Sequence, residues 1–339
     1  MNVKIPTTAP TELVDDQGLD TTLRPKTFSE YVGQEKTKEN LRIILEAAKK
    51  RNETPEHVLL HGPSGLGKTT LAHLVARQLN TNLRITSGTA LEKAGDVGSI
   101  LTGLGDGDVL FIDEVHRLNK SVEEVIYPAM ENYKLDIVIG KGNAAKTLQI
   151  DLPRFTLVAA TTKISLLSAP FRSRFGVSFR LEYYHDDEVI RILQRSAHLL
   201  GINVAPEALV RIAQSSRATP RVANRLLKRV RDFAQVHGHE DIDDEVAKTA
   251  LQLLEVDTRG LEETDRKILL AIATTFSGGP VGVKSIAAAV SEEEATIEDV
   301  YEPYLMRLGF IARTNRGRVI TKSGREHVGL DGDSGVLDF

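Results

Sequence analysis

The feature that most constrains this chain is the glycine-rich segment GPSGLGKT at residues 62–69. It matches the pattern GxxxxGK[ST] in full, and it lies between the short apolar run HVLLH at 57–61 and a segment with helical periodicity at 68–79. Glycines in such a loop let successive backbone N–H groups and the start of the next helix face a phosphate group. A phosphate-binding loop is therefore favoured over an ordinary glycine-rich turn, because the strand and helix context makes a chance match rare.

The residue types in and after this loop suit ATP and Mg²⁺. Lys68 would reach the β and γ phosphates as a point charge, and the Thr69 hydroxyl would complete the magnesium shell. Downstream, the apolar run at 108–113 ends in Asp113, and Glu114 follows it directly. The first acid can hold magnesium through water, and the second can orient or deprotonate the attacking water. Apolar strands often end in acids, so Asp113 and Glu114 indicate an ATPase only in combination with the phosphate-binding loop.

Two further polar pairs follow in the same part of the chain. Thr161 ends the apolar run at 155–161 and Thr162 follows it, and a hydroxyl at this place can contact the γ-phosphate or the attacking water, although threonine is also a common helix cap. Arg172 and Arg174 come shortly after. Exposed arginines are usually solvated or salt-bridged, but in an ATPase one of them is a candidate arginine finger, a group worth about 10³–10⁵ in rate.

The order of predicted elements divides the 339 residues into domains. After a polar arm at 1–22, a helix at 37–50 and strands at 57–61, 108–113 and 155–161 predict an α/β fold with a parallel sheet. A β-hairpin at about 132–153 is inserted between the second and third strands. Helical patterns at 187–200, 206–215, 220–237 and 243–254 predict a small helical domain, and a polar stretch near 258–263 is typical of a linker.

The charge changes sign near the end of the chain. Residues 291–302 carry six acids and no Lys or Arg, whereas residues 304–328 carry six Lys or Arg and the single acid Glu326. Two helices and a strand–turn–strand predict a winged helix with Arg316 and Arg318 at the wing tip and Arg313 at its base. Such a basic edge suits the phosphate backbone of DNA, and the alternative is a solvated surface. Residues that would read base edges are lacking, so we expect a grip that does not depend on DNA sequence.

Composition excludes several other classes of protein. The chain has no cysteine, so disulfides and thiolate metal sites are excluded, and no stretch approaches the roughly 18 apolar residues that span a bilayer. The N-terminus is polar and acidic, unlike a signal peptide. These features predict a cytoplasmic protein without a membrane partner.

Taken together, several segments resemble the RuvB family of AAA+ ATPases, the bacterial motors of Holliday-junction branch migration. The resemblance covers about residues 23–325 and is carried by LRPKTF, YVGQ, GPSGLGKTT, VLFIDEVHRL, IGKGNAAKTLQIDLP, AATTK, RSRFG, RATPRVANRLLKRVRDFA and YLMRLGFIARTNRGR. It implies a large AAA+ domain at 23–183, a helical lid at 184–256, a winged helix at 257–330 and a tail at 331–339. The chain departs from the family pattern at Ser64, Phe171, Ser173, Ala218 and Asn315.

The resemblance also assigns roles to residues. Thr161 or Thr162 resembles the first sensor, Arg221 the second sensor, and Arg174 the finger that reaches a neighbour's ATP, with Arg172 as the alternative. The implied nucleotide-binding residues are Leu23, Arg24, Tyr31, Val32, Gly62, Gly65, Leu66, Gly67, Lys68, Thr69, Thr70, Tyr184, Pro220 and Arg221.

The partners that the resemblance implies are duplex DNA, a homo-hexameric ring, the junction-binding protein RuvA docked on the hairpin at 132–153, and the resolvase RuvC in a larger complex. From the residues alone, the apolar side chains of the hairpin could equally cover the sheet. Two other functions share parts of this sequence, namely a clamp-loader-like AAA+ switch and a winged-helix initiator or regulator. The former usually lacks a winged helix, and the latter would need residues that read bases.

Overall fold

The computed structural model describes residues 21–139 and 146–330. The predicted arm up to residue 20, the hairpin tip at 140–145 and the predicted tail at 331–339 lie outside the described residues. The chain divides into two compact units. One is an α/β unit, Arg24–Tyr183, and the other joins Leu23 to the chain from Tyr184 onward.

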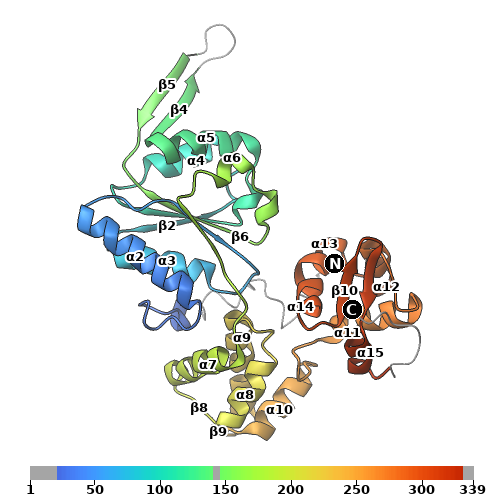
Figure 1. The fold of residues 1–339 in the computed structure, drawn as a ribbon. Coiled ribbons are helices and arrows are strands. Elements are labelled where there is room, and N and C mark those ends of the chain that lie inside the picture. Colours follow the sequence, from blue (N-terminus) through green and yellow to red (C-terminus); the bar gives the residue numbers. More distant parts are fainter. Residues whose placement is uncertain (1–20, 140–145, 331–339) are drawn as a thin grey trace. The chain divides into compact units, whose positions relative to one another are not determined.

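The α/β unit is built on a five-stranded parallel sheet with the order β2-β3-β6-β1-β7. Figure 1 shows α2 and α3 on one face of this sheet and α4, α5 and α6 on the other. The strands of the sheet are β1 (Val58–His61), β2 (Leu83–Ser87), β3 (Val109–Asp113), β6 (Thr156–Thr161) and β7 (Val177–Arg180). The helices are α2 (Glu35–Arg51), α3 (Lys68–Leu79), α4 (Ala94–Thr102), η1 (Val115–Arg117), α5 (Lys120–Asn132), η3 (Ile164–Leu166) and α6 (Ala169–Arg172).

The three predicted strands are confirmed, each beginning one residue later than expected, and α3 has the predicted bounds. The central strands β3 and β6 are buried along almost their whole length, which is why their apolar runs identify them. The edge strands β2 and β7 were not predicted. The inserted hairpin lies between the strands at 108–113 and 155–161, as expected, but because β2 precedes β3 these are the third and fourth strands of the sheet along the chain.

The inserted hairpin consists of β4 (Lys134–Ile139) and β5 (Lys146–Asp151), paired antiparallel. At its base, Leu135 is paired with Ile150, and Leu135 is 1% exposed within the core of the α/β unit. Farther along, Leu148 is 50% exposed. The base of the hairpin therefore belongs to the core, while Leu148 farther along presents apolar surface.

The second unit begins with the lid, whose helices are α7 (Asp186–Leu200), α8 (Pro206–Gln214), α9 (Pro220–Val236) and α10 (Asp244–Leu253). All four agree with the sequence prediction to within one residue at each end. A short parallel pair, β8 (Asn203–Val204) and β9 (Asp241–Ile242), joins two of the connecting loops. The buried faces of α7, α8 and α9 carry Val189, Leu209 and Leu226 at 4% exposure or less, as amphipathic spacing predicts.

The winged helix completes this unit around a separate apolar core that includes Leu261, Ile268, Tyr301, Leu305 and Ile320. Its elements are α11 (Glu263–Leu270), η4 (Ala271–Thr275), α12 (Val283–Val290), α13 (Glu294–Thr296), η5 (Ile297–Tyr301), α14 (Glu302–Arg307), β10 (Ile311–Thr314), β11 (Gly317–Ile320) and α15 (Lys322–His327). The stretch near 258–263 connects lid and winged helix as expected, but it is a packed turn, with Leu261 fully buried. Among the described residues, no helix has the length and hydropathy needed to cross a bilayer.

Candidate active site

The phosphate-binding loop leaves β1 and enters α3, and its shape depends on two glycines. Gly67 has φ +95°, and a Cβ there would lie 2.6 Å from the Tyr31 hydroxyl oxygen. Gly62 has φ +139°, and a Cβ there would lie 2.6 Å from the Leu181 carbonyl oxygen. Both positions therefore exclude other residues. Gly67 also caps α3 without a side chain that could occupy the first amide groups of the helix, which suits an anion.

Lys68 is 7% exposed and points into the loop. Its Nζ donates hydrogen bonds to the carbonyl oxygens of Gly62 and Pro63, each at 2.8 Å. Thr69 and Thr70 follow on the first turn of α3 and are half-buried, Gly65 has φ +79°, and Leu66 is fully buried. The loop residues predicted from the sequence thus form one continuous structure, with the ammonium group held inside it.

The carboxyl ends of β3 and β6 lie beside the end of β1, because β6 pairs with both strands. This register brings Asp113 and Glu114 next to Thr161 and Thr162, at the edge where parallel sheets bind ligands. Asp113 Oδ1 accepts a hydrogen bond from the Glu114 backbone N–H at 2.9 Å, and Glu114 has the left-handed φ of +45°. Thr162 Oγ1 donates to Glu114 Oε2 at 3.0 Å. The predicted base is therefore bonded directly to Thr162, one of the two predicted sensors.

On the other side of the loop, Tyr31 is 3% exposed and donates its hydroxyl to the Leu66 carbonyl oxygen at 3.2 Å. Val32 beside it is half-buried. Arg24 Nη1 lies 2.5 Å from His73 Nε2 on α3. Burial, followed by the charges of Arg24 and Arg77, lowers the pKa of His73 to about 4, so this imidazole is neutral and accepts the arginine N–H. Arg24 is thereby fixed to the helix that begins at the loop.

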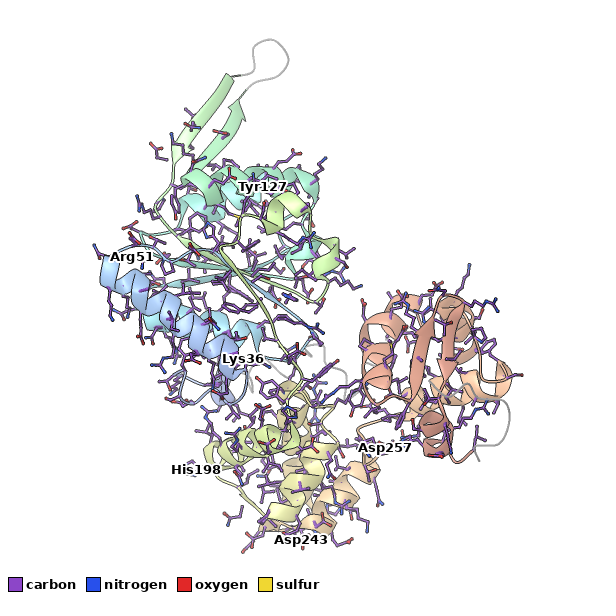
Figure 2. The ribbon with its side chains drawn as sticks, in the orientation of Figure 1. Lys36, Arg51, Tyr127, His198, Asp243 and Asp257 are labelled. Atoms are coloured by element: carbon purple, nitrogen blue, oxygen red, sulfur yellow. The ribbon has the colours of Figure 1, made fainter. Side chains whose placement is uncertain are left out.

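Of the two predicted finger residues, Arg172 is exposed at the end of α6. Arg174 is 20% exposed and held within its own unit, where Nη2 lies 3.0 Å from Glu131 Oε1 and Nη1 donates to the Pro170 carbonyl oxygen at 2.5 Å. Its guanidinium carbon is 4.3 Å from the centre of the Tyr127 ring, a cation–π distance. Tyr127 lies on α5, as Figure 2 shows. The sequence did not indicate Glu131 or Tyr127 as partners.

The remaining nucleotide residues predicted from the sequence belong to the second unit. Leu23 is 3% exposed, and its carbonyl oxygen accepts a hydrogen bond from Arg195 at 2.7 Å. Tyr184 is 2% exposed, and its N–H donates to the Ala218 carbonyl oxygen at 3.1 Å. Pro220 and Arg221, both half-buried, open α9 just after that turn. Tyr184 and the start of α9 are thus tied together by the lid backbone.

The turn before α9 holds a residue that the sequence analysis missed. Arg217 is 2% exposed and makes a bidentate ion pair with the fully buried Asp265 of the winged helix, with N–O distances of 3.1 and 3.2 Å. Its guanidinium carbon also lies 4.5 Å from the centre of the Tyr304 ring. Burial raises the pKa of Asp265, and the Arg217 guanidinium opposes that rise. Only tertiary packing distinguishes Arg217 from the other arginines of the lid.

The wing separates its three predicted DNA contacts. Arg316 is exposed in the turn between β10 and β11, and the side chain of Arg313 is 60% exposed. Arg318, opposite Arg313 in the hairpin register, is only 8% exposed, and its Nη2 lies 2.8 Å from Glu302 Oε2 and 2.9 Å from Glu298 Oε1. The guanidinium of Arg318 therefore faces the winged helix rather than solvent, and the expectation that it lies at the exposed wing tip is corrected.

This fold and site define the class of protein, an AAA+ P-loop ATPase with a helical lid and a C-terminal winged helix. Three family models cover nearly the whole chain. They are the RuvB P-loop domain of the Holliday junction DNA helicase at residues 23–181, the RuvB AAA lid domain at 184–257 and the RuvB C-terminal winged helix domain at 258–329. The chain belongs to the RuvB family.

Curated and solved relatives agree with this assignment. The chain is 55% identical over 318 residues to the Holliday junction branch migration complex subunit RuvB of Clostridium kluyveri, covering 94% of this chain and 91% of that protein. It also matches the solved structure of the Thermotoga maritima RuvB Holliday junction branch migration motor with a TM-score of 0.84 and 47% identity, covering 91% of this chain and 99% of that one. These relatives support the motor and give no support to the clamp-loader or regulator alternatives.

Proposed function

We propose that this chain is an ATP-driven motor that moves Holliday junctions during recombination and repair. The observation that supports it best is the convergence of the phosphate-binding loop, the acids after β3 and the threonines after β6, in a chain that ends in a winged helix with exposed basic side chains. Such a chain can release energy from ATP and grip a DNA backbone. A motor with this substrate would work in the bacterial cytoplasm.

In ATP hydrolysis, Lys68 and the amide groups at the start of α3 would bind the phosphates, and Glu114 would accept a proton from the attacking water. Thr69 and Asp113 supply the hydroxyl and carboxylate oxygens that Mg²⁺ prefers, and Gly67 leaves the first amide groups of α3 without a side-chain cap, so that they can bind phosphate. Bound there, the magnesium ion would neutralise phosphate charge. Thr161 and Thr162 would sense the γ-phosphate, while Arg24, Tyr31 and Val32, with Tyr184, Pro220 and Arg221 from the lid, would complete the nucleotide site.

The DNA grip would rest on Arg316 and Arg313. Both side chains are exposed, and guanidinium groups bind phosphate oxygens well. Arg318 would act indirectly, since its ion pairs with Glu302 and Glu298 hold β11 against α14 and η5. Because phosphate contacts carry no base information, affinity should be similar for all DNA sequences and should fall steeply with salt.

A homo-hexameric ring would place Arg174 near the ATP of a neighbouring subunit. Arg174→Ala should then retain ATP binding but lose turnover by about 10³–10⁵. Mixing Arg174→Ala with Glu114→Gln protein tests the intersubunit role, because some mixed interfaces would combine an intact arginine with an intact glutamate. Recovery of turnover in the mixture, measured against each variant alone, is the expected result. A mixture that stays inactive would rule out a finger acting between subunits and would direct attention to Arg172.

The hairpin at 132–153 would dock RuvA, with RuvC joining a larger complex. The half-exposed Leu148 supports this role, because its side chain is available to an apolar partner. Leu148→Asp should therefore reduce stimulation of ATP turnover by RuvA while leaving the basal rate unchanged, whereas Gln149→Asp serves as a matched polar control on the same strand. Full stimulation of Leu148→Asp by RuvA, equal to that of Gln149→Asp, would refute hairpin docking.

The motor itself is tested by strand exchange on a synthetic four-way junction with ATP, Mg²⁺ and RuvA. We expect movement of the junction that requires all three and ceases with Glu114→Gln. Turnover of ATP that responds neither to DNA nor to RuvA would contradict the proposed function and leave an ATPase with another task.

A further inference from the structure

One histidine in the ATPase centre has no role in the mechanism described so far. His116 lies on η1, directly after the acids of β3, and its side chain is only 6% exposed. Its Nδ1 lies 2.9 Å from Thr161 Oγ1 and 3.1 Å from Glu114 Oε2. A single ring nitrogen thus meets both the general base and the end of the sensor strand.

The chemistry of the neighbouring groups determines that Nδ1 of His116 is protonated. An ionised carboxylate has no hydrogen to give, so a contact of 3.1 Å with Glu114 Oε2 is attractive only if Nδ1 bears the proton. Nδ1–H then donates to Glu114 and to Thr161, and it cannot accept the threonine proton. Thr161 Oγ1 also accepts from the Lys163 N–H at 3.0 Å. With two N–H donors on its oxygen, the fully buried Thr161 keeps its own proton.

The same contacts distinguish the two oxygens of Glu114. Among the described residues, both donors that reach this carboxylate, His116 Nδ1–H and the Thr162 hydroxyl, meet Oε2. Two bonds to one oxygen fix the rotation of the carboxylate and leave Oε1 to accept the proton of the attacking water. A base needs such an orientation, because proton transfer depends on a hydrogen bond of suitable length and direction.

We infer that His116 is a positioning residue of ATP hydrolysis, which ties the Glu114 carboxylate to the Thr161 hydroxyl through one shared N–H. This inference rests on the proposed roles of Glu114 and Thr161. It adds that the base and the sensor hold one geometry, so that a change at the Thr161 hydroxyl reaches Glu114 without passing through the nucleotide. His116 touches neither phosphate nor water in this scheme, so its loss should affect kcat and spare ATP binding.

The test compares three replacements in the full-length protein. His116→Phe keeps the ring volume but removes the donor, and it should lower kcat by roughly 10- to 100-fold, part of the 10²–10⁴ that a positioned base contributes, with KM and the Kd of a fluorescent ATP analogue within about twofold. His116→Asn places an amide N–H near the Nδ1 position and should recover most of kcat. His116→Gln places its amide near the Nε2 position and should not.

Two controls separate this role from folding and from the proposed function. His57→Phe removes another buried histidine of the α/β unit, which bonds the Leu157 N–H and the Met130 carbonyl, so it should lower Tm but keep kcat. In a Glu114→Gln background, His116→Phe should have little further effect, because the two residues act as one unit. Full kcat in His116→Phe, or no recovery in a folded His116→Asn, would overturn the inference. Activity retained by Glu114→Gln alone would instead refute the proposed base.

Discussion

The ATPase centre and the wing both rely on charged side chains, but they hold them in different ways. In the ATPase centre Lys68 is 7% exposed and donates to loop carbonyls, and Glu114 is bonded by its neighbours. On the wing Arg316 is exposed in a turn, while Arg318 two residues later is buried and paired. The first region fixes its charges in advance, as electrostatic catalysis requires, and the second keeps Arg316 in solvent for a partner of variable sequence.

The largest expected difference comes from the loop lysine. Lys68→Ala removes a fixed charge from the phosphate site, so ATP turnover should fall by at least about 10³-fold, while DNA binding measured without nucleotide should change little. Lys36→Ala, on the exposed face of α2, provides a control with the same change of charge. Steady-state turnover and fluorescence anisotropy on duplex DNA measure the two effects, and an equal loss of both would erase the distinction between the regions.

The buried arginine of the wing should affect stability. Arg318→Ala leaves the Glu302 carboxylate, which is 5% exposed, without its closest cation, so the winged helix should lose about 3–5 kcal/mol of unfolding free energy. Thermal unfolding followed by circular dichroism measures this loss. Arg313→Ala, at the opposite and exposed register position, should change stability by less than about 0.5 kcal/mol. Similar unfolding curves for the two variants would mean that the Arg318 ion pair contributes nothing.

The exposed arginine of the wing should affect binding alone. Arg316→Ala should weaken DNA affinity equally for all sequences and reduce the slope of log K against log salt by about one. Asn315→Ala, at the neighbouring exposed position, is the uncharged control. The measurement is a salt titration with two unrelated duplexes, and a sequence-dependent loss would point to base contacts instead.

The smallest expected effect concerns acid stability of the α/β unit. The pKa of His73 is lowered from 6.5 to about 4 by burial and by the charges of Arg24 and Arg77. As pH falls, His73 is protonated near pH 6.5 in the unfolded chain but only near pH 4 in the folded protein. The free energy of unfolding therefore decreases as pH drops from 6.5 towards 4. Because the ring is only half-buried, the loss is at most about 2 kcal/mol. His73→Gln should flatten stability over this range in urea titrations, and an unchanged pH dependence would contradict the shift.

Sequence alone predicted the parts of the molecule in which local pattern and structure coincide. Backbone geometry and periodic burial each require particular residue types at fixed spacings along the chain. This is why the sequence predicts the loop at 62–69, the acids after β3 and the four lid helices. The edge strand β2 shows no such apolar pattern, because its residues are half-buried or exposed and include Arg84, Thr86 and Ser87. Its place in the sheet follows from pairing with β3.

The arginines show where local pattern stops being informative. Arg316 and Arg318 are alike in sequence context, yet packing against α14 buries only the second. Arg174 was predicted as a finger, but its contacts with Glu131 and Tyr127 involve residues more than forty positions away. Arg217 of the lid was overlooked because its partner, Asp265, lies 48 positions away in the winged helix. For such residues the partner, rather than the residue type, decides the role.

The Arg217–Asp265 ion pair also limits how this chain can be cut or recombined. The family models for the lid and the winged helix meet between residues 257 and 258, a natural junction for building chimeras. Yet Asp257 accepts a hydrogen bond from His327, and Arg217 lies buried against Asp265 and Tyr304, so both contacts cross that junction. A hybrid with a foreign winged helix would need matching residues at 265, 304 and 327, because otherwise it would enclose an uncompensated guanidinium in the turn that precedes Pro220 and Arg221.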